Sequence, residues 1–189
     1  MGPYHAIMAH FPVAFWIVAA GIIVYRACTD GPLALALDRV LVVLLAIGAA
    51  MGVIAYVFGQ LVWPPGTLQK TPLGRNHMLG ATWTLSCWSA VLYLRWRVGD
   101  AVWDGRINRL VMAIVGALGG TLLAITGTLG GHLHGAPAYL SELLRMVGFD
   151  VYTTFYVPTW VLVAIALAAI AMPVLARVAI RAERPGATP

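Results

Sequence analysis

Long apolar stretches alternate along this chain with short links that carry the charged residues. Five such stretches lack Asp, Glu, Lys and Arg and are long enough, at about 1.5 Å per residue, to cross roughly 30 Å of hydrocarbon as helices. We therefore predict an all-α, polytopic membrane protein whose single domain, residues 1–189, is a bundle of five transmembrane helices. The helices are expected near residues 5–26, 39–62, 77–96, 108–131 and 154–178, with a short interfacial helix near 138–147.

Composition supports the membrane assignment. Hydrophobic residues make up 61% of the 189-residue chain and charged residues only 10%. A soluble domain of this size could not hide so much apolar surface. The first stretch is expected to be retained as a helix, because no Lys or Arg precedes it as in a signal peptide.

Lys and Arg residues are unevenly divided between the two ends of the predicted helices. One side has nine, namely Arg26, Arg39, Arg95, Arg97, Arg106, Arg109, Arg177, Arg181 and Arg184, and the other has three, namely Lys70, Arg75 and Arg145. Because basic residues are held on the cytoplasmic side, we predict a multi-pass protein of a bacterial inner membrane with its N-terminus outside and its C-terminus inside. Nucleic-acid binding is not expected, since the basic residues are spread over short links.

All five histidines fall at the same end of the predicted helices. His5 and His10 open the first helix, His77 opens the third, and His132 and His134 close the fourth. Alternating helix direction would bring them together in the outer leaflet. Ionisable residues inside a membrane are costly and mark function, so these residues are the candidate site.

The helical spacing of the histidines limits the kind of site they can form. His10 lies about 7.5 Å deeper than His5 and about 140° around the helix, and His132 and His134 differ by roughly 200°. His10 is the leading ligand, because an uncompensated polar group at its depth is costly. The alternative for each histidine is a side chain that is hydrogen-bonded and has no ligand. The angles disfavour a compact zinc site that uses all five, and favour ligands that face one another across the bundle.

Neutral imidazoles from separate helices are the ligands of a b-type haem, which four-helix cores commonly host. We therefore expect His5, His10, His77, His132 and His134 to include the ligands of one or two haem groups, and Arg75 to contact a propionate. Lys70 and Arg145 on the same side are further propionate partners. Asn76 is predicted to cap the third helix, which places His77 in the first turn, where the helix dipole favours the neutral ring.

Glycines recur at helix-packing spacing. The pairs Gly48/Gly52, Gly116/Gly120 and Gly127/Gly131 indicate close helix contacts. The alternative is that Gly127, Gly130 and Gly131 make room for a flat macrocycle. Cys28 and Cys87 lie at different depths of their helices, and both are expected to be reduced.

The string His5-Ala6-Ile7-Met8-Ala9-His10-Phe11-Pro12 resembles the opening of the bacterial membrane family called domain of unknown function 2231. His77 and the segment Gly130-Gly131-His132-Leu133-His134-Gly135 are similar to a mid-chain histidine and a Gly-Gly segment of that family, so the resemblance covers about residues 5–135. This chain departs from it at Ala6, where a proline is usual, and in a longer C-terminal tail. Some relatives are joined to Rieske-type iron–sulfur modules, which implies a redox role.

Together these features predict a b-type cytochrome that transfers electrons as a subunit or partner of a respiratory complex. Its partners would be a periplasmic redox protein or quinol, other membrane subunits and the lipid bilayer. It is not expected to be an enzyme on its own, because its acidic residues lie in links and it has no catalytic carboxylate pair. Met8 and Met78 beside histidines suggest a copper or other metal-ion handling protein as an alternative. A structural subunit without cofactor is the second alternative.

The segment near 138–147 would be a lid over the histidines or a helix resting on the headgroups.

Overall fold

The computed structural model describes residues 2–154, so the helix predicted at 154–178 and the three C-terminal arginines lie outside the described residues. All regular structure in the described part is helical, and these residues belong to one compact unit. The α-helices are α1 (Gly2–Cys28), α2 (Pro32–Gln60), α3 (Pro72–Val98), α4 (Gly105–Leu133) and α5 (Tyr139–Met146), and two short 3-10 helices are η1 (Leu68–Lys70) and η2 (Gly99–Trp103).

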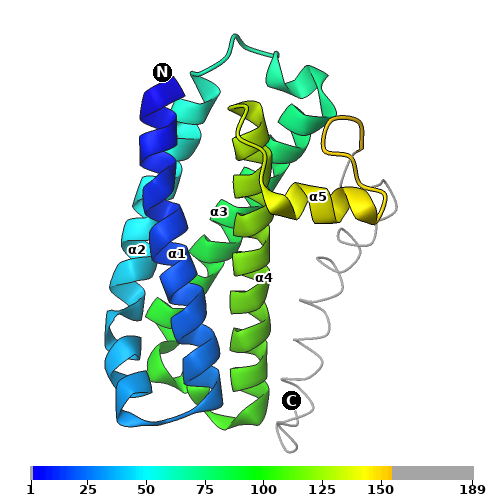
Figure 1. Ribbon diagram of the computed structural model, residues 1–189. Coiled ribbons are helices and arrows are strands. Elements are labelled where there is room, and N and C mark those ends of the chain that lie inside the picture. Colours follow the sequence, from blue (N-terminus) through cyan, green and yellow to red (C-terminus); the bar gives the residue numbers. More distant parts are fainter. Residues whose placement is uncertain (1, 155–189) are drawn as a thin grey trace, which may run out of the picture. The chain divides into compact units, whose positions relative to one another are not determined.

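The four long helices run alternately up and down, and the short α5 lies beside α4, roughly perpendicular to it (Figure 1). α1 packs on α2 and α4, and α3 packs on α4 and α2. Helices are present at the positions of the first four predicted long helices and of the short one. α1, α3 and α4 extend beyond their expected bounds at both ends, whereas α2 begins earlier than expected and ends at Gln60 instead of residue 62. The largest extensions are at the starts of α2 and α3, where Pro32 and Pro72 occupy the first helical turn. Proline is favoured there because its missing N–H would have no partner, and the charge pattern could not reveal this.

Within residues 2–154, three helices are long and apolar enough to cross a membrane: α1, α2 and α4. α2 and α4 have 29 residues each, which corresponds to roughly 43 Å at the rise of an α-helix. Large apolar side chains on the outer faces of these helices are exposed, including Ile17, Val43 and Leu110. A belt of exposed Leu, Ile and Val is the surface expected of a helix bundle in lipid.

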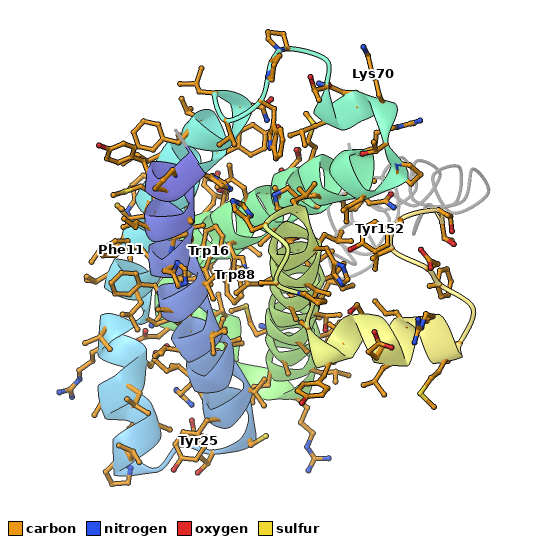
Figure 2. All side chains as sticks on the ribbon, turned by 45° about the horizontal axis from the view of Figure 1, so that its top comes forward. Phe11, Trp16, Tyr25, Lys70, Trp88 and Tyr152 are labelled. Carbon is orange, nitrogen blue, oxygen red and sulfur yellow. The ribbon has the colours of Figure 1, made fainter. Side chains whose placement is uncertain are left out.

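The centre of the bundle holds two stacked tryptophans. The rings of Trp16 on α1 and Trp88 on α3 are both buried, with centroids 5.8 Å apart and planes at 13° (Figure 2). A Cβ added at Gly52 on α2 would lie 2.8 Å from Trp16, and one at Gly119 on α4 would lie 2.9 Å from Trp88. These two glycines therefore leave the space in which the indole rings pack, which confirms the packing interpretation of Gly52.

A buried ionic cluster joins the helices at the end opposite the histidines. Asp38 on α2 accepts hydrogen bonds from Arg95 Nη2 on α3 at 2.7 Å and from Trp103 Nε1 in η2 at 3.2 Å. Arg26 and Arg109 both pair with Asp30 in the α1–α2 link, and they hold the pKa of its carboxyl below the usual value, Arg109 more strongly. The expectation that the acidic residues lie in links was wrong for Asp38, because α2 begins six residues before it.

Both described cysteines, Cys28 and Cys87, are free thiols, as expected.

Candidate functional site

Four of the five histidines line one cavity between the long helices. The cavity has a volume of about 540 Å³ and is bordered by His5 and His10 from α1, His77 from α3, and His134 directly after α4. The starts of α1 and α3 and the end of α4 meet at the same end of the bundle (Figure 1). Helix direction therefore explains why residues so distant in sequence lie at the same end of the bundle.

Two of these histidines are held by neighbouring helices. His5 Nδ1 lies 2.8 Å from the carbonyl oxygen of Ala55 on α2, and His77 Nδ1 lies 3.1 Å from that of Thr126 on α4. The rings sit against glycines, since a Cβ at Gly59 would lie 3.0 Å from His5 Cε1 and one at Gly130 would lie 3.0 Å from His77 Cε1. Each imidazole is thus fixed between its own helix and the next one.

The other two cavity histidines are held by their own helices. His10 Nδ1 lies 2.6 Å from the carbonyl oxygen of Ala6, and His134 Nδ1 lies 2.9 Å from that of Gly130. A carbonyl oxygen can only accept, so Nδ1 carries the proton in all four cavity histidines. In the neutral ring Nε2 then keeps its lone pair, which is the state in which a histidine binds a metal.

Two of the cavity rings lie near each other in nearly parallel planes. The ring centroids of His5 and His134 are 6.4 Å apart, and their planes differ by only 18°. These residues come from opposite ends of the described chain, and the approach of α1 to the end of α4 brings them together.

His132 does not line this cavity. Its Nδ1 is hydrogen-bonded to the hydroxyl of Tyr152 at 2.9 Å, and its Nε2 is buried without a hydrogen-bond partner among residues 2–154. Because it lies two residues before His134 at the end of α4, its ring leaves the helix on a different side. The sequence alone gave no signal for the contact between His132 and Tyr152.

The three basic residues expected near propionates do not line the cavity either. Arg75 is exposed near the start of α3, Lys70 is in η1, and Arg145 on α5 forms an exposed ion pair with Glu142 at 2.7 Å. The link after α4 contributes Ala136 to the cavity wall, whereas no described residue of α5 does. The geometry therefore gives no support to α5 as a lid.

The predicted cap of the third helix was wrong. Thr71 caps α3, and its hydroxyl accepts a hydrogen bond from the Gly74 N–H at 3.1 Å. Asn76 is buried in the second turn and donates to the Thr154 carbonyl at 2.9 Å. His77 is consequently too far along α3 for the free N–H groups of the first turn to act on it.

Deeper in the bundle the cavity wall is almost wholly apolar. Trp16, Leu85 and Leu123 form much of it, and its polar groups include Thr84 and Thr126, whose hydroxyls lie 3.1 Å apart. Gly127 also lines the cavity, and a Cβ there would meet nothing within 4 Å. At this position the alternative interpretation of the α4 glycines, room for a ligand, fits better than helix packing.

The histidines do not form a compact metal cluster. Within residues 2–154, no three or more His, Cys, Asp or Glu side chains are grouped so that they could hold one metal ion. A smaller cavity of about 40 Å³ is nevertheless lined by His5, His77, His134 and Met78. With the side chains in their present positions, a metal ion bound among the described residues would have at most two His, Cys, Asp or Glu ligands.

Comparisons with known proteins add no relative. No family model matches the chain, and neither a curated protein nor a solved structure is significantly similar to it. The resemblance to domain of unknown function 2231 therefore stays a prediction, and the function has to be argued from the site.

Proposed function

We propose that this protein is a multi-pass membrane protein that binds haem b between its helices and transfers electrons. One observation carries the proposal: four histidines from three helices surround an apolar cavity, and in each of them a backbone carbonyl holds Nδ1. This hydrogen bond fixes the tautomer whose Nε2 can bind iron. Metal-ligating histidines characteristically donate their second N–H in this way.

The residues present fit a porphyrin. The cavity volume of about 540 Å³ lies within the range of roughly 300–1,000 Å³ found for sites of small molecules and cofactors. Its apolar wall suits the ring, and its position at one end of the bundle leaves the polar propionates a route to water. Two histidines suffice as iron ligands, so the lack of a larger metal cluster in the described residues is no obstacle. Bound haem would supply one-electron chemistry, and the protein supplies ligands and a dry environment.

The position of the cavity limits the side of the membrane on which electrons can be exchanged. All four histidines line a cavity at one end of the bundle, and we propose that this end faces the periplasm, because Lys and Arg are fewer there than at the other end. The donor or acceptor would be a periplasmic redox protein or a quinol, and electrons would be exchanged near the outer surface of a bacterial inner membrane. The protein would act as a subunit or partner of a larger respiratory assembly, and not as an enzyme by itself.

A visible absorption spectrum of the detergent-purified protein tests the proposal. We expect a Soret band and a reducible α band, with haem stoichiometry of one or two per chain by the pyridine haemochrome assay. Protein expressed with added haem precursor that is colourless, and that does not bind haemin in titration, would contradict haem binding.

A copper-handling function is the second candidate, because Met78 lines the 40 Å³ cavity beside three histidines. Thioether and imidazole ligands suit copper. Stoichiometric copper in the purified protein, without Soret absorption, would favour this function. Neither metal nor pigment would leave a structural subunit.

A further inference from the structure

We infer that His5 and His134 are the pair that binds the haem iron, one from each face, with nearly parallel imidazole planes. This inference rests on the proposed haem binding and goes beyond it, since it selects two of the four cavity histidines. It also changes the leading ligand, because helix depth alone had favoured His10.

The first support is the distance between the rings. A metal–nitrogen bond is about 2.0–2.1 Å and an imidazole centre lies about 1 Å beyond its nitrogen, so two rings on opposite sides of one ion have centres roughly 6 Å apart. The centroids of His5 and His134 are 6.4 Å apart and their planes differ by 18°, which matches this separation. Among residues 2–154, no other two histidine rings lie nearly parallel at such a distance.

The second support is that both rings are already held by backbone. His5 Nδ1 donates to Ala55 O at 2.8 Å and His134 Nδ1 to Gly130 O at 2.9 Å. The two carbonyls belong to α2 and α4, so the orientation of each ring is set by a rigid helix. Such outer contacts fix the direction in which Nε2 points.

The His5 ring packs directly against Gly59 on α2. A Cβ at Gly59 would lie 3.0 Å from His5 Cε1 and 3.2 Å from Nδ1, closer than ordinary van der Waals contact. An alanine there would push the imidazole away from α2 and disturb its hydrogen bond with Ala55. Gly59 is therefore a positioning residue for this ligand.

The remaining cavity histidines are less suited to form the pair. The His10 side chain is exposed and bonded to its own helix at Ala6, and no ring faces it within the described residues. His77 is held between α3 and α4 as firmly as His5 is held against α2, but within residues 2–154 no histidine ring lies parallel to it as His134 does to His5. Both line the cavity and would contact the edge or face of the macrocycle.

The test uses the full-length protein in detergent, with haem incorporated during expression or by titration with haemin. We expect the wild-type protein to be low-spin and six-coordinate. Its electron paramagnetic resonance spectrum should be the rhombic type given by parallel imidazole planes, and not the highly anisotropic type given by perpendicular ones. His5→Ala and His134→Ala should each convert the haem to the high-spin form, and added imidazole should restore the low-spin spectrum.

Matched variants keep this result interpretable. His10→Ala and His77→Ala should remain low-spin, and Gly59→Ala, which retains every histidine, should show a mixed or shifted low-spin signal. Rescue by imidazole shows that a variant is folded around its haem. A low-spin spectrum in both His5→Ala and His134→Ala, or a high-spin one in His10→Ala or His77→Ala, would overturn the pair. Wild-type protein that takes up no haem would instead overturn the proposed function itself.

Discussion

At the scale of single residues, the backbone decides what the polar side chains can do. Each cavity histidine is held in one tautomer by one carbonyl oxygen, and two of these carbonyls belong to a neighbouring helix. At the other end, Asp38 is buried with a side chain only 7% exposed and is satisfied by Arg95 and Trp103. A carboxylate buried among apolar helices, such as that of Asp38, persists because it has hydrogen-bond partners.

Asp38→Asn should destabilise the protein by about 3 kcal/mol. Removing one member of a buried ion pair leaves an uncompensated charge, and the cost lies at the low end of the usual range because Arg95 keeps Asp100 as a partner at 2.7 Å. Denaturant unfolding in detergent would measure the loss. The control is Glu142→Gln, which breaks the exposed pair with Arg145 and should cost less than about 1 kcal/mol. Equal effects of the two substitutions would show that Asp38 is not a structural anchor.

At the scale of the helices, glycine has two different roles. Gly52 on α2 and Gly119 on α4 let indole rings pack where a Cβ would clash. Gly127 on α4 instead faces open space in the cavity, so no neighbouring side chain requires a glycine there. The space beside Gly127 belongs to the ligand in the proposed function.

Gly127→Leu should therefore abolish or reduce haem content at least tenfold without lowering stability. The new side chain would fill part of the cavity and meet no atom near its Cβ. Gly21→Leu is the matched control, because a Cβ at Gly21 on α1 also meets nothing within 4 Å, and Gly21 does not line the cavity. Haem per chain and thermal unfolding of the two variants would be compared. Wild-type haem content in Gly127→Leu would place the haem outside this cavity.

At the scale of the whole described unit, the two ends of the bundle differ in chemistry. One end gathers the histidines around the cavity, and the other gathers Arg and Asp side chains into the ionic cluster. The links at the ionic end follow α1 and α3, and the links at the histidine end follow α2 and α4 (Figure 1). Because consecutive helices in an antiparallel bundle run in opposite directions, alternate links lie at the same end, and the residues of the two sets of links are kept apart.

The orientation of the protein in the membrane can be read from its own thiol. Cys28 is exposed at the ionic end of α1. With Cys87 replaced by Ser, Cys28 should react with a membrane-impermeant maleimide only after the cells are permeabilised. Gln69→Cys, in the exposed loop at the histidine end and with both natural cysteines replaced, should react in intact cells. The opposite pattern would reverse the orientation, and labelling of both sites from one side would contradict the crossing of the membrane by α2.

Much of this arrangement follows from sequence alone. The positions of α1 to α4 follow from runs of apolar residues, and that of α5 follows from apolar residues at helical spacing, since both are local properties of the chain. Strict alternation of helix direction then brings the candidate histidines to one end, because short links leave antiparallel packing as the simple arrangement. Sequence could not place the starts of α2 and α3, where prolines in the first turn extend each helix beyond its uncharged run.

Only tertiary structure decided which of these residues form the site. The rotation of each helix about its axis is set by packing, such as Trp16 against Gly52, and it turns His134 toward the cavity and His132 toward Tyr152. Backbone carbonyls leave no trace in a sequence, so the partners of His5 and His77 could not be foreseen. The burial of Asp38 could not be predicted either. A carboxylate at the end of an apolar run is typical of a link, and only the tertiary structure shows that Asp38 is buried and accepts a hydrogen bond from Arg95 of α3.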